Sequence, residues 1–325
     1  MNVLVTGGAG YIGSVVSDAL LAEGHDVVVY DDLRKGHRAA VAADARLIEA
    51  DLADEVSLSA ALTRYNVDAV VHMAGYIQVG ESTVDPGKYF DNNVAASLVL
   101  LRAMISTGVR KLVYSSSAAV YGEPMQTPIP EKHPTAPTSP YGLSKLVIEQ
   151  MLPWYDRACG LRYASLRYFN AAGATESRGE DHDPETHLIP LVLQVAMGRR
   201  QAVEVYGVDY PTRDGTCVRD YIHVADLATA HVLALGRLER GSCVYNLGNG
   251  EGFTVREVID TARRVTGHPI PVVESDRRPG DPAVLVAGSE RLRRDLGWTP
   301  RMPDLADIVE SAWRWMSAHP GGYDG

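Results

Sequence analysis

Two side chains that can move a proton lie four residues apart in the segment Tyr141-Gly-Leu-Ser-Lys145. In a helix this spacing places the phenol and the ammonium on one face. A tyrosine ordinarily titrates at about 10, which is too high for a base at neutral pH. A neighbouring lysine and a positively charged cofactor ring would both favour the phenolate. Tyr-x-x-x-Lys pairs also occur by chance on helix surfaces, so the pair needs a structural context.

A glycine pattern near the N-terminus supplies part of that context. Gly7, Gly10 and Gly13 follow a short apolar run and open a stretch with helical spacing. In a dinucleotide site such glycines allow a tight turn, a close approach to the pyrophosphate and close helix packing, while the helix N-terminus faces the phosphates. Asp31 falls about 20 residues further on, where a carboxylate binds ribose hydroxyls and repels a 2′-phosphate. The pattern therefore predicts NAD, with Arg34 and Lys35 as the argument for NADP.

The elements that would position these residues alternate along the chain. Apolar runs that predict strands are Val3–Thr6, Asp26–Tyr30, Arg46–Ala50, Ala69–Met73, Lys111–Ser115 and Leu161–Leu166. Stretches that predict helices are Ile12–Leu21, Val56–Tyr65 and Asn93–Thr107. This alternation predicts an α/β fold with a Rossmann-type doubly wound parallel sheet. Ser115-Ser116-Ser117 then stands at the end of the fifth strand, at the sheet edge where such folds bind ligands.

The pattern loosens after about Ala172, where turn residues become frequent. We therefore expect a Rossmann domain over residues 1–172 and a smaller mixed α/β domain for the substrate over residues 173–325. Val224–Leu235 predicts a helix and Cys243–Leu247 a strand, so the segments near 224–247 are expected to pack back onto the first domain. Pro153 is expected to end or kink the helix that begins near Tyr141.

The composition limits the partners. The 325 residues carry a net charge of −10, which argues against nucleic acid and anionic membranes. No apolar run has the length of a membrane span. The three cysteines are widely spaced, which is typical of a reduced, cytoplasmic protein. No set of histidines, cysteines and carboxylates shows metal-ligand spacing, so no metal is expected. His72 and His223 are expected to be hydrogen-bonded core residues.

Longer motifs extend from one end of the chain to the other. They are Val3-Leu-Val-Thr-Gly-Gly-Ala-Gly-Tyr-Ile-Gly13, Val79-Gly-Glu-Ser82, Asp91-Asn-Asn-Val94, Ser115-Ser-Ser-Ala-Ala-Val-Tyr-Gly122, Ser139-Pro-Tyr-Gly-Leu-Ser-Lys145, Leu166-Arg-Tyr-Phe-Asn170, Asp214-Gly-Thr-Cys-Val-Arg-Asp-Tyr-Ile-His223 and Tyr245-Asn-Leu-Gly248. Through these motifs the chain resembles the UDP-glucose 4-epimerases (UDP-galactose 4-epimerases) of the extended short-chain dehydrogenase/reductase family. The Asp-Gly-Thr-x-Val-Arg-Asp-Tyr-Ile-His segment is the most specific of them.

The resemblance implies a mechanism and a set of contacts. Tyr141 would take the proton of the sugar 4-hydroxyl while hydride passes from C4 to NAD, Ser117 would hydrogen-bond the same oxygen, and Lys145 would hold the nicotinamide ribose and lower the tyrosine pKa. The 4-keto sugar would then turn over and take the hydride back on its other face. The implied NAD-binding residues are Gly7, Gly10, Tyr11, Ile12, Gly13, Asp31, Asp32, Leu33, Asp51, Leu52, Ala74, Gly75, Asn92, Ser115, Tyr141, Lys145 and Phe169. The implied UDP-sugar-binding residues are Ser117, Tyr141, Asn170, His187, Leu188, Val205, Tyr206, Arg219, Arg278, Asp281 and Leu285.

Several residues distinguish the possible functions. Ala118-Ala119 follows the serine where related dehydratases carry an acid and a base, so epimerisation is favoured over dehydration. Ile77 replaces a lysine that reaches the cofactor in many of these epimerases, and Leu285 stands at a gate that separates hexoses from N-acetylhexosamines. An epimerase for another nucleotide sugar, including N-acetylhexosamines, is the alternative, and a non-catalytic dinucleotide sensor is a remote one. The resemblance also implies a homodimer formed through a helix pair, for which Asn93–Thr107 and Lys145–Leu152 are available.

Overall fold

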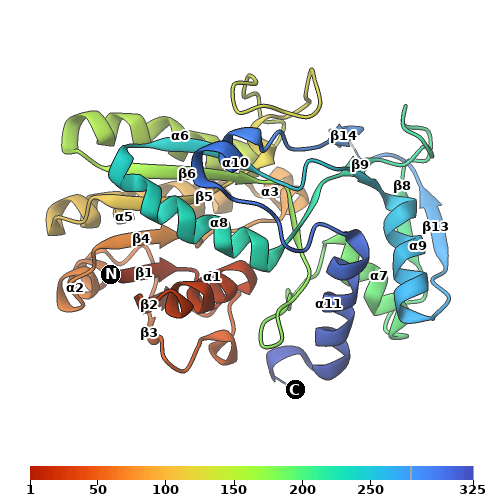
Figure 1. Ribbon diagram of the computed structural model, residues 1–325, viewed down its shortest axis with the longest axis horizontal. Coiled ribbons are helices and arrows are strands. Elements are labelled where there is room, and N and C mark those ends of the chain that lie inside the picture. The colour runs from red at the N-terminus through yellow and green to blue at the C-terminus, as the bar shows by residue number, and fades with distance from the viewer. Residues whose placement is uncertain (279, 325) are drawn as a thin grey trace.

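A computed structural model describes residues 1–278 and 280–324. Gly325, the last residue of the expected second domain, lies outside this range. The central element is a seven-stranded parallel sheet with the order β11-β6-β5-β4-β1-β2-β3 (Figure 1). Its strands are β1 (Asn2–Thr6), β2 (Asp26–Asp31), β3 (Arg46–Glu49), β4 (Ala69–His72), β5 (Lys111–Ser117), β6 (Arg162–Tyr168) and β11 (Cys243–Leu247). The predicted doubly wound sheet is confirmed.

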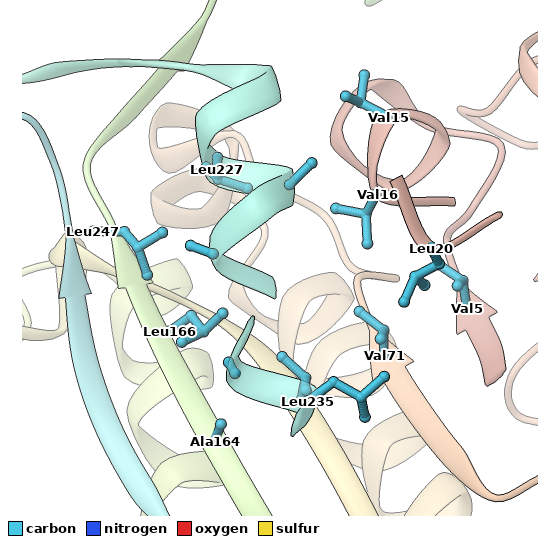
Figure 2. Packing of buried hydrophobic residues seen from close by; sticks show 14 of the residues in the cluster. Val5, Val15, Val16, Leu20, Val71, Ala164, Leu166, Leu227, Leu235 and Leu247 are labelled. Atoms are coloured by element: carbon cyan, nitrogen blue, oxygen red, sulfur yellow. The ribbon is translucent and has the colours of Figure 1, made fainter. Parts of the chain in front are cut away.

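Helices cover both faces of this sheet. Helices α1 (Tyr11–Ala22) and α8 (Val224–Arg237) pack against one face, and α2 (Glu55–Arg64), α5 (Ala96–Thr107) and α6 (Pro140–Cys159) pack against the other. Figure 2 shows the first of these layers, where Val15, Val16 and Leu20 of α1 meet Val5 and Val71 of the sheet and Leu227 and Leu235 of α8 lie over Leu166. Each helix therefore buries one apolar stripe, as its sequence period requires.

Two segments from late in the chain complete this layer. Strand β11 pairs in parallel with β6, Cys243 opposite Ala164, and so forms one edge of the sheet. Helix α8 lies beside α1. The residues of β6 that β11 and α8 cover, Ala164 and Leu166, are fully buried. After β6 the chain leaves the sheet and returns to it only with α8 and β11. The sheet layer is therefore completed by residues that come after the intervening segment.

A second hydrophobic core lies beside the sheet. It is formed by α7 (Leu188–Ala196), α9 (Val255–Thr266), α11 (Leu305–Ala318) and the parallel pair β8 (Val203–Tyr206) and β13 (Val272–Ser275), which Figure 1 shows gathered on the right. The remaining elements are α3 (Val79–Val84), α4 (Pro86–Tyr89), a π-helical turn (Phe90–Ala95), β7 (Asn170–Ala172), β9 (Val218–Arg219), β10 (Tyr221–His223), β12 (Phe253–Thr254), β14 (Val284–Leu285), α10 (Glu290–Leu296) and the 3-10 turns Arg38–Ala40, Ala118–Val120, Leu238–Arg240 and Gly322–Asp324.

The structure corrects one expectation about helix α6. Pro153 lies inside the helix, which continues to Cys159 and ends at Gly160 in a left-handed conformation. The helix is therefore not ended by the proline. Glycine provides the stop instead, because a residue without Cβ adopts the positive φ of the C-terminal cap without strain. Among the described residues no helix is both long and apolar enough to cross a membrane.

Candidate active site

Helix α6 begins at the site, and its first turn is fixed by serines. Ser139 caps the helix by accepting a hydrogen bond from the Gly142 N–H at 3.1 Å. The Tyr141 N–H, one of the free donors of this first turn, donates to Ser82 Oγ of α3 at 3.2 Å. Ser82 belongs to the Val79-Gly-Glu-Ser82 motif, although the sequence did not indicate what it does. The start of α6 is thereby held against α3.

The three residues expected to do the chemistry lie together. Ser117 ends β5, and its hydroxyl hydrogen-bonds the Tyr141 phenol. Lys145 follows one turn later on α6, with Nζ 6.0 Å from the centroid of the Tyr141 ring and 2.8 Å from the Ser115 carbonyl oxygen to which it donates. All three therefore converge at the carboxyl edge of β5, where parallel sheets bind their ligands.

Burial controls the protonation of this group. Burial raises the pKa of Tyr141, and the Ser117 hydrogen bond partly opposes this. Burial lowers the pKa of Lys145 to about 8, while the carboxylate of Glu149 acts in the opposite direction. The sequence led us to expect a tyrosine pKa lowered by the lysine. In the structure desolvation is the larger effect on both groups, because each is enclosed by protein.

A buried ion pair supports the helix below Lys145. Glu149 lies one further turn along α6 and pairs with Arg167 of β6, Nε to Oε1 at 2.9 Å, and the two side chains are only 5% and 8% exposed. Ser116 Oγ donates to the same carboxylate at 2.5 Å, and Arg167 also donates to the Tyr121 hydroxyl at 2.9 Å. These contacts connect α6 to β5 and β6 directly beneath the site. The sequence analysis did not find this network, because its members are far apart in the chain.

The glycine turn fits a dinucleotide. Gly7 has φ +69°, and a Cβ on Gly13 would lie 2.1 Å from the Gly7 carbonyl oxygen, so both positions require glycine. Gly10 precedes α1 without a side-chain cap, which leaves the first N–H groups of the helix available to a pyrophosphate. Tyr11 holds this end of α1 in place by donating its hydroxyl to the Gly173 carbonyl at 2.6 Å.

The loop after β2 favours NAD over NADP. Both carboxylate oxygens of Asp31 accept backbone N–H groups, from Ala9 at 3.0 Å and from Leu33 at 2.9 Å, so the carboxylate is fixed beside the glycine turn. Arg34 pairs with Asp32 and with Asp51, to whose Oδ2 it donates at 2.8 Å. A cation already paired with two carboxylates is a poor partner for a 2′-phosphate. This answers the argument for NADP that the sequence left open.

Asn93 connects the cofactor side to the catalytic helix. Its buried side chain accepts from the Tyr76 N–H at 2.8 Å and donates to the Tyr76 carbonyl at 3.0 Å and to Ser144 Oγ at 3.1 Å. Asn92, which was expected to contact NAD, donates its side-chain amide to Asn93 Oδ1 at 3.1 Å. Asn93 thus holds the segment after β4 next to Lys145, a role that the adjacent asparagines in the sequence could not reveal.

The remaining cofactor residues surround the glycine turn and the ends of β2, β4 and β6. Ile12 of α1 packs against the core on one face of the sheet, and Leu52 is buried in the core on the other face. Ala74 and Gly75 follow β4, and a Cβ on Gly75 would lie 3.7 Å from Lys145 Nζ. Phe169 follows β6 and packs with Leu285 against the apolar cluster that contains Ala118. The structure therefore places Leu285 and Phe169 against one apolar cluster, to which the residue after Ser117 also belongs.

Charged residues face one another on the substrate side. Arg219 of β9 pairs with Asp281, and the Arg278 guanidinium lies 3.8 Å from the centroid of the Tyr206 ring. Asn170 begins β7 and donates its N–H to the Asp220 carbonyl at 3.0 Å. Val205 is the exception, because its side chain is buried in the second core and only its backbone can face a ligand.

His187 and Leu188 lie where the chain enters α7. His187 precedes the helix, and its ring is grouped with Glu180, His182 and Glu185 so that one ligand atom of each lies within 4.8 Å of the others. We expected no metal because no ligand spacing was recognised. The structure brings these four side chains together in space, although their spacing in the sequence matches no familiar metal-binding motif. His72 and His223 do satisfy both ring nitrogens with hydrogen bonds in the core.

Residues 3–248 match the NAD dependent epimerase/dehydratase family, and the chain belongs to this family. It is similar to the UDP-glucose 4-epimerase of Streptomyces lividans, with 55% identity over 99% of this chain and 98% of that protein. Among solved structures it is similar to the UDP-glucose 4-epimerase of Brucella ovis in complex with NAD, with 46% identity, a TM-score of 0.94 and coverage of 97% and 98%. The enzyme of Bifidobacterium longum in complex with NAD⁺ and UDP gives 40% identity, a TM-score of 0.95 and coverage of 99% and 100%. The expected family and its cofactor, NAD, are confirmed.

Proposed function

We propose that this chain is an isomerase that interconverts UDP-glucose and UDP-galactose by NAD-dependent epimerisation at C4. The observation that carries this proposal is the grouping of Ser117, Tyr141 and Lys145 at the carboxyl edge of the sheet, next to the glycine turn. Ala118-Ala119 follows the serine and offers no acid or base. A dehydratase must expel a hydroxyl group and needs such groups, whereas an epimerase needs one base and a sugar that is free to turn.

The side chains have distinct tasks in this reaction. The chemistry that NAD would supply when bound is reversible hydride transfer at C4 of the sugar. Tyr141 takes the proton of the 4-hydroxyl, and Ser117 holds the same oxygen by a hydrogen bond. Lys145, with Nζ 6.0 Å from the centroid of the Tyr141 ring, supplies positive charge towards the phenolate that forms. After the 4-keto sugar has turned, Tyr141 gives the proton back to the oxygen.

Two arginines account for the diphosphate of the substrate. Arg219 and Arg278 lie on the same side as Tyr206 and Asp281, and a guanidinium matches phosphate oxygens in charge and geometry. In the structure Arg219 is paired with Asp281. A diphosphate would therefore compete with or share that partner. We infer that these residues, with Asn170, Leu188 and the backbone of Val205, hold the UDP part.

The decisive experiment supplies the purified protein with UDP-galactose, with and without added NAD, and separates the products. We expect UDP-glucose to form. If no UDP-glucose forms under either condition, the proposal is wrong. Activity that requires added NAD would show that the cofactor is lost during purification. Ile77, which is exposed between the cofactor loop and α3, is the residue to change in that case, and Ile77→Lys should then increase NAD retention.

The sugar range depends on Leu285, which packs beside Phe169. A bulky side chain at this position would narrow the sugar pocket, and a small one would leave room for an N-acetyl group. Leucine is intermediate in size between the two. UDP-N-acetylgalactosamine is therefore the second substrate to assay, and Leu285→Ala should raise its turnover relative to UDP-galactose. An unchanged ratio would show that Leu285 does not form the gate.

We further propose that the protein is a cytoplasmic homodimer formed through α5 and α6. On α6, the Trp154 side chain is 67% exposed and so offers an apolar surface to a partner helix. All three cysteines are free, as expected of a reducing compartment. Light scattering should give twice the chain mass, and Trp154→Glu should shift the protein towards monomer. A monomeric wild-type protein would refute the dimer.

A further inference from the structure

Four side chains of metal-binding type converge in the loop that leads into α7. They are Glu180, His182, Glu185 and His187, and one donor atom of each lies within 4.8 Å of all the others. This cluster lies on a different segment from Ser117, Tyr141 and Lys145, and only His187 among its members was expected to contact the UDP-sugar. Two imidazoles and two carboxylates are a donor set that suits zinc and related divalent metals.

The distances between the donor atoms match a single small cation. His187 Nδ1 lies 2.8 Å from Glu180 Oε1 and 2.8 Å from Glu185 Oε1. His182 Nδ1 lies 3.1 Å from Glu180 Oε1 and 3.6 Å from Glu185 Oε2. A tetrahedral zinc ion with ligands at about 2.0–2.1 Å separates those ligands by about 3.3 Å. These four contacts, in which His182 and His187 meet different oxygens of Glu185, lie on both sides of that value, and one donor atom of each residue lies within 4.8 Å of the others.

The charges of the cluster also favour a cation. The side chains of Glu180 and Glu185 are only 7% and 5% exposed, so two carboxylates are close together and nearly removed from water. A divalent ion bound to two neutral imidazoles neutralises both carboxylates. The two imidazole rings lie with their centroids 5.3 Å apart, and each directs Nδ1 towards the carboxylates. One cation among these atoms would bind all four groups at once.

The loop that carries the cluster touches the cofactor side of the molecule. Lys35 Nζ donates to the Asp183 carbonyl at 2.5 Å, and the Gln78 side chain donates to the Pro184 carbonyl at 3.0 Å. The ring of Tyr11, which begins α1, stands edge-on to His182 with centroids 6.1 Å apart. At its other end the loop enters α7 through His187. An ion in this loop would therefore connect the glycine turn with the substrate side.

We propose that Glu180, His182, Glu185 and His187 form a structural site for one divalent transition metal, with zinc as the preferred ion. All four positions of a tetrahedral ion are filled by protein atoms, so no position is left for a reacting water, as in structural rather than catalytic zinc sites. Metal at Nδ1 also leaves the proton of His187 on Nε2, where it can act as a hydrogen-bond donor. The site stands whether or not the chain is an epimerase, because it rests on this cluster alone.

The test measures metal content directly. The protein is produced without a histidine tag, dialysed against buffer with an equimolar amount of zinc, passed through a desalting column and analysed by plasma mass spectrometry. We expect about one zinc per chain. The double variant His182→Gln/Glu185→Gln should bind less than a tenth of that amount. The matched control His268→Gln/Glu251→Gln, which changes the same residue types at exposed positions, should keep the full amount.

A second measurement covers the case in which the double variant does not fold. Wild-type protein is stripped with a chelator, its melting temperature is recorded, and cobalt or zinc is added back. Removal should lower the melting temperature by several degrees, and cobalt should restore it with the intense visible absorption of a four-coordinate ion. Zinc well below one per chain, retention of zinc in the double variant, a pale six-coordinate cobalt spectrum, or a melting temperature indifferent to the chelator would each mean an adventitious ion only and overturn the proposal.

Discussion

Two glycines of the same turn should fail in different ways when each is changed to alanine. A Cβ on Gly13 would lie 2.1 Å from the Gly7 carbonyl oxygen and 2.9 Å from Gly8 Cα, whereas a Cβ on Gly10 would have its nearest neighbour, the Gly7 oxygen, at 3.4 Å. The atoms around Gly13 belong to the backbone and cannot rotate away. Relief requires α1 to move by about 1 Å from the turn, since an ordinary carbon–oxygen contact is about 3.2 Å or more.

That movement is opposed by the packing of α1. Val15, Val16 and Leu20 are buried against β1, β4 and α8 (Figure 2), so a shift of the helix disturbs the largest core of the molecule. Overpacking of this kind costs about 1–3 kcal/mol, and a clash with backbone belongs at the upper end. We expect Gly13→Ala to lower the free energy of unfolding by about 3 kcal/mol without any cofactor, which corresponds to a fall of about 4 °C in melting temperature for a chain of this length. Gly10→Ala should stay within about 0.5 kcal/mol of the wild type.

Gly10→Ala, which should leave stability nearly unchanged, should nevertheless impair NAD binding. A methyl group at Gly10 would stand in front of the uncapped N–H groups that are to receive the pyrophosphate. Calorimetric titration of cofactor-free protein should therefore show at least a tenfold loss of NAD affinity for Gly10→Ala, together with a wild-type urea midpoint. If Gly13→Ala unfolds at the wild-type midpoint, or if Gly10→Ala loses as much stability as Gly13→Ala, the geometric reasoning is refuted.

Three other changes test the site. Tyr141→Phe should reduce kcat about 10³-fold and leave NAD affinity unchanged; near-normal turnover would remove Tyr141 as the base. Burial lowers the pKa of Lys145 from 10.5 to about 8. Between these pH values the unfolded chain still carries the lysine proton, whereas the folded chain has lost it. The free energy of unfolding therefore rises with pH over this range because of Lys145. Lys145→Met should consequently lack about 3 kcal/mol of that rise between pH 7.5 and 10.5, measured by urea unfolding of cofactor-free protein; parallel curves would contradict the assignment. Glu149→Gln leaves Arg167 buried without its counter-charge and should cost about 3 kcal/mol or more, whereas Glu310→Gln, in an exposed pair with Arg314, should cost less than about 0.5 kcal/mol. Equal losses would contradict the role of Glu149 as the counter-charge of a buried Arg167.

Local patterns predicted the sheet well, because its strands are short apolar runs that repeat between amphipathic helices. The strand expected at Cys243–Leu247 has those bounds in the structure. Helix α6 was predicted less well, since Pro153 was expected to interrupt it. The helix tolerates the proline, and tertiary packing of Ile148 and Leu152 against the sheet helps to hold it.

The support of the site could not be predicted from local patterns. Asn93, Glu149 and Arg167 act through partners that lie 17 to 51 residues away in the chain. Only the fold brings such groups together. The effect of burial on the Tyr141 pKa was also not predicted, since spacing indicates which charges are near and not how much water is excluded.

The place of β11 has a consequence for synthesis of the protein on the ribosome. When residue 172 has been added, the glycine turn, Ser117 and Tyr141 are all present, but the edge of β6 and the outer face of α1 still lack the strand and helix that cover them. The sheet therefore cannot gain its edge strand until residues 224–247 have emerged from the ribosome, after the intervening segment has been made. Such late pairing of distant segments slows folding and leaves an open strand edge in the nascent chain. A fragment that stops at residue 172 should accordingly aggregate.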